Sequence, residues 1–199
     1  RRWGGRARGE ALMGKLVLVE HLTLDGVMRA PGRVDEDERD GFAHGGWAVP
    51  GNDEVMASVL GKGMGGGGAL LLGRRTYEDF YGYWPHQGGN PFTDVLNRTR
   101  KYVMSRTMTE APWENSVLLK DAGDVEGVEE DLTVLGSGVL ARELMRRGLV
   151  DEWLLMIHPL VLGTGRRLFD GVETRIRLVD SMVTTTGVVI ATYRSKEEA

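Results

Sequence analysis

The chain contains no cysteine among its 199 residues, and this absence excludes several kinds of chemistry. Without thiols there can be no disulfide framework, no thiolate-bound zinc and no cysteine nucleophile. Such a composition suits a reducing compartment, and we expect a cytoplasmic protein. Long hydrophobic runs are missing as well, because no segment approaches the roughly 20 apolar residues that cross a bilayer. We therefore expect no association with a membrane.

An excess of positive charge is also missing. Lys and Arg residues number 25 against 29 Asp and Glu residues, which gives a formal net charge of −4. A chain of this sign repels a phosphate backbone as a whole, so we expect no nucleic-acid partner. The negative net charge still allows small anionic ligands to bind where arginines cluster locally. Hydrophobic residues at 41% and charged residues at 27% are ordinary values for a globular protein.

The length of the chain suits one domain with a sizeable core. Its first twelve residues are basic, lack the apolar run of a secretory signal, and precede Met13. We interpret residues 1–13 as an extension outside the fold, with a functional basic arm as the alternative. The domain is then expected to span residues 14–195.

Short apolar segments alternate with glycine turns and helical patterns through the first three quarters of the domain. A long stretch without periodicity, residues 27–50, follows the first strand and is expected to form a flap over a functional site. Strands are predicted within residues 15–26, 69–72, 102–104, 117–119 and 132–135. Helices are predicted from Asn52 or Asp53 to about Gly61, from Arg74 through the following aromatic stretch, and from Ala141 to Gly148.

The last third of the domain has a different pattern. Three long apolar segments, DEWLLMIHPLVLG, RIRLVDSMVTTTG and VVIATYRS, follow one another, and Gly187 marks a hairpin between the last two. Strand–helix units followed by a closing antiparallel pair predict an α/β fold with a mixed, mostly parallel sheet flanked by helices.

Three of the predicted strands end in similar turns: LLLGRRT at 70–76, VMSRT at 103–107 and VLGSG at 134–138. The carboxyl ends of parallel strands lie along one edge of a sheet, where ligands bind, so these turns should converge. Arg74 or Arg75, together with Arg106, would offer guanidinium groups that match phosphate oxygens. Two arginine-bearing turns carry more positive charge than one pyrophosphate requires. This excess suggests an additional phosphate and favours NADP over NAD. Alternatively, these arginines are solvated and pair with Glu78 and Asp79.

The third turn carries a glycine motif. Gly136, Gly138 and Ala141 match the pattern GxGxxA between a strand and a helix, where backbone amides can approach a pyrophosphate. The motif lies late in the chain and lacks an acidic residue about 20 positions downstream, which disfavours a two-half dinucleotide fold. The same glycines could equally serve a tight turn alone.

Four segments together resemble the landmarks of the dihydrofolate-reductase-like superfamily, in its RibD C-terminal branch. They are TLDG at 23–26, LLLGRRTYEDF at 70–80, YVMSRT at 102–107 and the long segment at 134–169. The resemblance covers nearly all of residues 14–195. It implies a three-layer fold with helices on both faces of the sheet, bound NADPH, and a cis peptide bond between Gly136 and Ser137. The implied cofactor-binding residues are Gly73, Arg74, Arg75, Thr76, Ser105, Arg106, Thr107, Gly136, Ser137, Gly138, Val139 and Leu140.

The resemblance also points to residues on the substrate side. Dihydrofolate reductases bind the pterin ring with a carboxylate at the start of the helix after the flap, and Asp53 looks like its counterpart, with a catalytic role in proton delivery. The alternative for Asp53 is a helix N-cap. Asp25 is a candidate for substrate binding or a turn residue, and Trp47 for ring stacking or lid packing. His158 is expected to pack, and no metal is expected.

Three functions remain open from the sequence. The first is an NADPH-dependent reductase of a small pteridine-like or aminopyrimidine substrate, related to the 5-amino-6-(5-phosphoribosylamino)uracil reductase of riboflavin biosynthesis. The second is an NADP-binding or regulatory module of the same fold without turnover. The third is an interaction protein whose edge strands dimerise. A homodimer is expected from the apolar C-terminal strands, and one flanking helix is expected to be reduced, because residues 120–131 are short for it.

Overall fold

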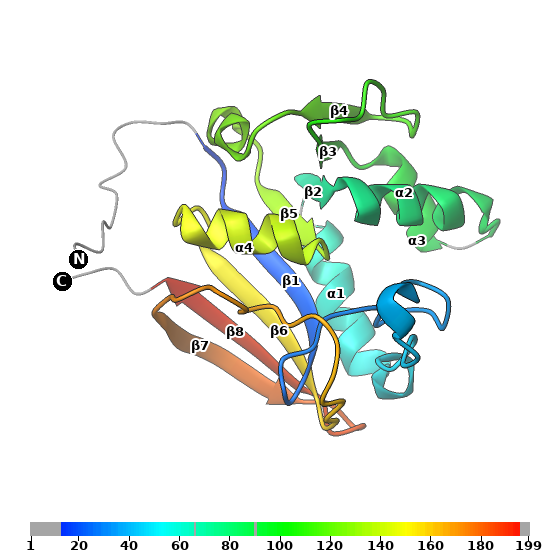
Figure 1. Ribbon diagram of the computed structural model, residues 1–199, viewed down its shortest axis with the longest axis vertical. Helices are drawn as coiled ribbons and strands as arrows, with labels where there is room; N and C mark the ends of the chain where they lie inside the picture. The colour runs from blue at the N-terminus through cyan, green and yellow to red at the C-terminus, as the bar shows by residue number, and fades with distance from the viewer. Residues whose placement is uncertain (1–12, 66, 90, 196–199) are drawn as a thin grey trace.

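The order of the strands explains how distant turns come together. The computed structural model describes residues 13–195 except 66 and 90, so most of the predicted extension 1–13 lies outside the described residues. Its sheet has eight strands in the order β4-β3-β2-β5-β1-β6-β8-β7 (Figure 1). The strands are β1 (Leu16–Thr23), β2 (Ala69–Gly73), β3 (Lys101–Met104), β4 (Ser116–Leu119), β5 (Leu132–Leu135), β6 (Glu152–His158), β7 (Ile176–Val183) and β8 (Val189–Ser195).

In the order of the sheet, every pair of neighbouring strands between β4 and β6 is parallel. Strand β8 runs antiparallel to β6, and β7 runs antiparallel to β8. The predicted mixed sheet with a C-terminal antiparallel hairpin is therefore confirmed. Because consecutive β–α units run parallel, their carboxyl ends share one edge of the sheet. The helices are α1 (Glu54–Gly65), α2 (Arg74–Tyr83), α3 (Pro91–Arg98) and α4 (Gly138–Arg146), with 3-10 turns η1 (Arg39–Gly41), η2 (Val49–Gly51), η3 (Trp84–His86) and η4 (Ala122–Gly127).

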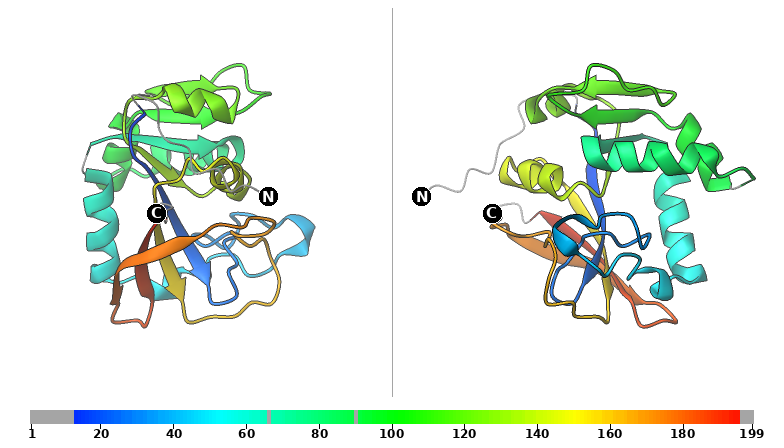
Figure 2. Two further views of the ribbon diagram at one scale, coloured as in Figure 1. Left: turned by 90° about the vertical axis from the view of Figure 1, so that its left-hand side faces the viewer. Right: turned by 45° about the vertical axis from the view of Figure 1, so that its right-hand side comes forward.

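Helices cover both faces of the sheet, as Figure 2 shows, and the alternation of side chains along the strands explains why. On one face Leu18 and Leu71 pack with α4 residues such as Leu144. On the other face Val19 packs with Met56 of α1. A further cluster joins β2 and β3 to α2 and α3 on that second face. The expected three-layer arrangement is thus confirmed.

Local details differ from the sequence prediction in two places. The helix expected to end near Gly61 continues to Gly65, into the glycine-rich tract. The helix Pro91–Arg98 was not predicted, because its apolar signal is spread over only eight residues that also include polar ones. The segment 120–131 holds only the short turn η4, as expected. No helix in the described part of the chain is long and apolar enough to span a membrane.

Candidate functional site

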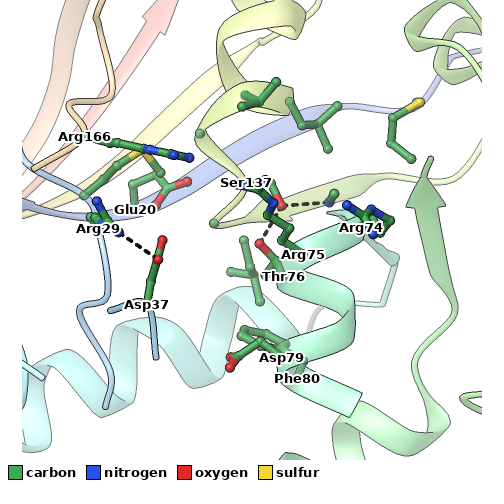
Figure 3. A pocket seen from close by; sticks show the side chains of 18 of the residues that line it. Glu20, Arg29, Asp37, Arg74, Arg75, Thr76, Asp79, Phe80, Ser137 and Arg166 are labelled. Atoms are coloured by element: carbon green, nitrogen blue, oxygen red, sulfur yellow. Dashed lines mark hydrogen bonds and ion pairs between the residues drawn. The ribbon is translucent and has the colours of Figure 1, made fainter. Parts of the chain in front are cut away.

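One cavity of about 980 Å³ borders the carboxyl ends of β3, β2 and β5 and the middle of β1, strands that are neighbours in that order (Figure 3). Helix α2, helix α4 along its length and the segment after β1, within residues 28–39, form most of the remaining wall. The turns singled out in the sequence therefore converge on a single concave site. A cavity of this size and position is where ligands bind in open α/β sheets.

The turns after β2 and β5 are locked together by one side chain. The backbone N–H of Gly73 donates to Ser137 Oγ at 2.7 Å, and Ser137 Oγ donates to Thr76 Oγ1 at 2.6 Å. A Cβ atom on Gly73 would lie 2.7 Å from Ser137 Oγ and 2.9 Å from Ser137 Cβ, closer than real Cβ atoms approach. Glycine at position 73 thus allows the two turns to touch.

The glycine turn leads directly into α4. Gly136 and Ser137 have φ angles of 62° and 63°, and these two left-handed residues redirect the chain from the sheet into the helix. The peptide bond between them is trans, so the expected cis bond is wrong: consecutive left-handed residues make the same turn without it. The first N–H groups of α4, at Gly138 to Leu140, have no carbonyl partner within the helix. They border the cavity and suit an anion.

Eleven of the twelve predicted cofactor residues line this cavity, and Thr107 does not. Arg74 forms an ion pair with Glu78 at 3.4 Å, and Arg106, whose side chain is 81% exposed, pairs with Asp121 at 3.3 Å. Exposed pairs of this kind are worth about 0–1 kcal/mol, so an anionic ligand can replace the carboxylates. The pairing of Arg74 with Glu78 agrees with the alternative stated for that residue.

The hydroxyl of Ser105 serves its own turn. Its Oγ accepts hydrogen bonds from the backbone N–H groups of Thr107 at 3.3 Å and Met108 at 3.1 Å. Ser105 is buried and lines the cavity. The Ser105 hydroxyl thus shapes the turn that carries Arg106.

The flap predicted at residues 27–50 closes one side of the cavity. Arg33 joins it to α2 through an ion pair with Asp79 and lies 4.7 Å over the ring of Tyr83. The indole N–H of Trp47 donates to the carbonyl of Arg29 at 2.7 Å. Trp47 does not line the cavity, so its contacts are those of lid packing.

Asp53 and Asp25 also lie outside the cavity lining. Asp53 Oδ1 accepts the N–H of Met56 at 2.8 Å, and Oδ2 accepts the N–H and the hydroxyl of Thr185, both at 2.7 Å. The hydrogen bonds from Met56 and Thr185 lower the pKa of Asp53. The contact with Met56 is that of a helix cap, and the contacts with Thr185 tie Asp53 to the β7–β8 hairpin. The structure therefore does not bring the predicted catalytic carboxylate to the cavity.

Asp25 ties the end of β1 to a distant loop. It accepts the hydroxyl of Thr23 at 2.6 Å and the N–H of Gly163 at 2.8 Å, and it forms an ion pair with Arg167 at 3.3 Å. The Thr23 hydroxyl and the backbone N–H groups hold the pKa of Asp25 well below its ordinary value. Its contacts are those of the turn residue that the sequence offered as the alternative to substrate binding.

His158 lies in a buried packing position. Its Nε2 is 2.9 Å from Nδ1 of His21, and its ring meets the edge of Trp47 at 5.2 Å between centroids. Burial, and then the neighbouring His158, lower the pKa of His21 to about 4. No group of three or more potential metal ligands is found among the described residues.

Glu20 is the site residue that the sequence reasoning missed. It lines the cavity, is only 4% exposed, and its Oε1 has no hydrogen-bond partner among the described residues. Burial, and then the charge of Glu36, raise its pKa well above the ordinary value. The signal was available in LVLVEHLT, where Glu20 occupies an inward position in the row of Leu16, Leu18 and Leu22.

Comparison with known proteins places these features in context. Residues 118–190 match the family described as RibD C-terminal domain. The chain is 31% identical to the uncharacterized protein YyaP of Bacillus subtilis (strain 168), in a match covering 77% of this chain and 88% of YyaP. In structure it is similar to a protein of Shewanella sp. PV-4 with a proposed role in riboflavin biosynthesis (TM-score 0.66, 20% identity, 92% of this chain and 99% of that one). It is also similar to the dihydrofolate reductase of Enterococcus faecalis complexed with NADP(H) and RAB-propyl (TM-score 0.58, 14% identity, 93% of this chain and 98% of that one).

Proposed function

Because the chain belongs to the family that carries the RibD C-terminal domain, we propose that it is an NADPH-dependent reductase of a small pteridine-like or aminopyrimidine heterocycle. The observation that carries the proposal is the convergence of three separate turns, after β2, β3 and β5, on one cavity. The similar enterococcal reductase was solved with NADP(H), which supports the choice of cofactor. A bound NADPH would supply the hydride for the reduction.

The residues present fit such a cofactor. The glycine turn and the N-terminal amides of α4 would hold the pyrophosphate, because they border the cavity and their first N–H groups have no carbonyl partner within the helix. Arg74, Arg75 and Arg106 offer positive charge along the same edge, where the additional phosphate of NADP would bind. The 980 Å³ cavity leaves room beside β1 for a second, smaller molecule.

The proposal is tested first by binding. At about 100 times its Kd, NADPH should raise the free energy of unfolding by roughly 2.7 kcal/mol, measured by chemical denaturation. NADH at the same concentration should stabilise much less, since it lacks the 2′-phosphate. Substitution Arg106→Ala should weaken NADPH binding and leave NADH binding nearly unchanged, whereas Arg177→Ala, at an exposed position on β7, serves as the matched control. Equal stabilisation by the two dinucleotides would count against the proposal.

Turnover is tested next, by the oxidation of NADPH with a panel of heterocycles that includes the aminopyrimidine substrate of riboflavin biosynthesis. Oxidation with one class of ring and not another supports a reductase. Tight NADPH binding without oxidation across the panel favours the alternative, a nucleotide-binding module without turnover.

A further inference from the structure

A buried carboxyl group lines the cavity beside the glycine turn that follows β5. The parallel register pairs Val19 of β1 with Leu135, the last residue of β5. Glu20 is the next residue along β1, and it therefore lies beside the point where the chain leaves the sheet at Gly136. Figure 3 shows its carboxyl group projecting from β1 into the cavity. The arginines at the ends of β2 and β3 lie two and three strands away in the sheet order.

The carboxyl group of Glu20 lacks the partners that such a group needs when it serves only the fold. Its Oε1 has no hydrogen bond within the described residues, although the side chain is almost fully buried. An ionised carboxylate in this position would be strongly disfavoured, because burial removes its hydration. The raised pKa of Glu20 has this cause. A neutral carboxylic acid, in contrast, offers one O–H donor and one carbonyl acceptor to a ligand.

The charged groups around Glu20 do not neutralise it as a carboxylate. Glu36, on the flap, repels a second negative charge and raises the pKa of Glu20 further. Arg29 directs its Nη2 to Asp37 at 2.9 Å and to the carbonyl of Arg39, while its Nε has no partner among the described residues. The other arginines on this side are engaged as well: Arg166 pairs with Asp40 at 3.8 Å and Arg142 donates to the carbonyl of Arg167 at 3.0 Å. His21, the next residue on β1, instead meets His158.

We infer that Glu20 is the acid that protonates the substrate, and that the substrate is a ring with a C=N bond whose nitrogen approaches this carboxyl group. The inference rests on the proposed reductase function. Reduction of C=N places a hydride, supplied by bound NADPH, on carbon and a proton on nitrogen. The O–H bond of Glu20 breaks, an N–H bond forms with the electron pair of the C=N π bond, and the resulting carboxylate regains a proton from water. A raised pKa keeps such an acid protonated near neutral pH.

The protonation of Glu20 is tested without cofactor or substrate. Infrared difference spectra of the wild type against Glu20→Gln at pH 7 should contain the C=O stretch of a protonated carboxyl group. The free energy of unfolding gives a second readout. Because the folded state holds the proton to higher pH than the unfolded chain, the stability of the wild type relative to Glu20→Gln should fall as pH rises above about 4.3 toward the folded pKa. Absence of both signals would overturn the inference.

The catalytic role is tested by the pH profile of kcat. In the wild type kcat should fall as pH rises through the pKa of Glu20, and in Glu20→Gln it should be reduced by about 10²–10⁴-fold and lose this limb, with the Kd for NADPH within about twofold of wild type. Glu36→Gln should keep the limb and move it to lower pH, because the repulsion is removed. Asp53→Asn should keep the limb unmoved.

The outcomes separate the two proposals. A wild type that neither binds nor oxidises NADPH overturns the proposed function, whereas the infrared band reports on Glu20 in either case. A wild type that turns over, with Glu20→Gln within threefold of its kcat at every pH, overturns only the inference. If the limb disappears in Asp53→Asn and persists in Glu20→Gln, the acid is Asp53. Should Glu20→Gln fold poorly, Glu20→Met, of similar length and without a proton to give, replaces it in the same assays.

Discussion

Substitution Gly73→Ala tests whether the cavity depends on the close approach of two turns. The backbone at Gly73 has φ −76° and ψ 157°, a conformation that any residue adopts, so only space demands glycine here. An added Cβ would lie 2.7 Å from Ser137 Oγ and 2.9 Å from Ser137 Cβ. Ser137 cannot simply rotate away, because its hydroxyl bonds both Gly73 N–H and Thr76 Oγ1. The turns must therefore move apart.

The expected loss of stability follows from two effects. Overpacking of this kind costs about 1–3 kcal/mol, and loss of the hydrogen bond from the Gly73 N–H costs about 0.5–1.5 kcal/mol. Together they predict a decrease of about 1.5–4.5 kcal/mol in the free energy of unfolding, measured with urea. Affinity for NADPH should fall with it, since both turns border the proposed site. The control is Gly82→Ala in α2, where no atom lies within 4 Å of the new Cβ and a small gain in stability is expected.

A double-mutant cycle with Ser137→Gly makes the test specific. Removing the Ser137 side chain also removes the atoms that block the new Cβ, and it relieves a left-handed φ of 63°. The double variant should therefore be more stable than the sum of the two single effects by about 1–2 kcal/mol. Simple additivity, or a Gly73→Ala protein with wild-type stability and wild-type NADPH affinity, would refute the argument.

Two further predictions concern Lys101 and the free edge strand. Burial lowers the pKa of Lys101 to about 8, and its Nζ donates to the carbonyls of Leu96 and Thr99, each at 2.6 Å. Because the unfolded chain holds this proton to about pH 10.4, the free energy of unfolding should rise between pH 8 and 10.4. Lys101→Met should abolish this rise in denaturation curves. If the variant kept the same pH dependence as the wild type, the assignment to Lys101 would be wrong. Strand β7 forms one edge of the sheet and exposes Leu178 (54%) and Val183 (67%). We therefore expect light scattering to detect a homodimer, and Val183→Glu to shift it toward the monomer. A wild-type protein that stays monomeric at high concentration would count against this prediction.

The framework of the fold could be predicted from the sequence because its signals are local. LLLG at 70–73 and the run before Gly136 combine short apolar segments with glycine, and the rule that parallel strands share an edge then brings their turns together. The helix Pro91–Arg98 lacks such a signal. It is recognisable mainly by its tertiary contacts, since its own Leu96 is buried in one cluster with Trp113, which lies outside the helix.

The carboxylates of the site could not be assigned from sequence for a different reason. Whether Asp53 enters a cavity depends on Thr185, 132 positions away, which occupies one of its two oxygens. The other oxygen is taken by the N–H of Met56, as its capping position allows. A local pattern can indicate a helix cap, but only the tertiary structure shows whether the carboxylate retains a free oxygen for a ligand.

The contrast between Glu20 and Asp53 gives a physical criterion for separating a catalytic carboxyl group from a structural one. The three hydrogen bonds that Asp53 accepts occupy both of its oxygens and join α1 to the β7–β8 hairpin, so they need no ligand to explain them. Glu20 has the opposite balance, because an unpaired buried polar atom costs about 1–3 kcal/mol. A leucine there would continue the row of Leu16, Leu18 and Leu22 without that cost. The proposed substrate would supply the missing partner, and this is why we assign the catalytic role to Glu20 and not to Asp53.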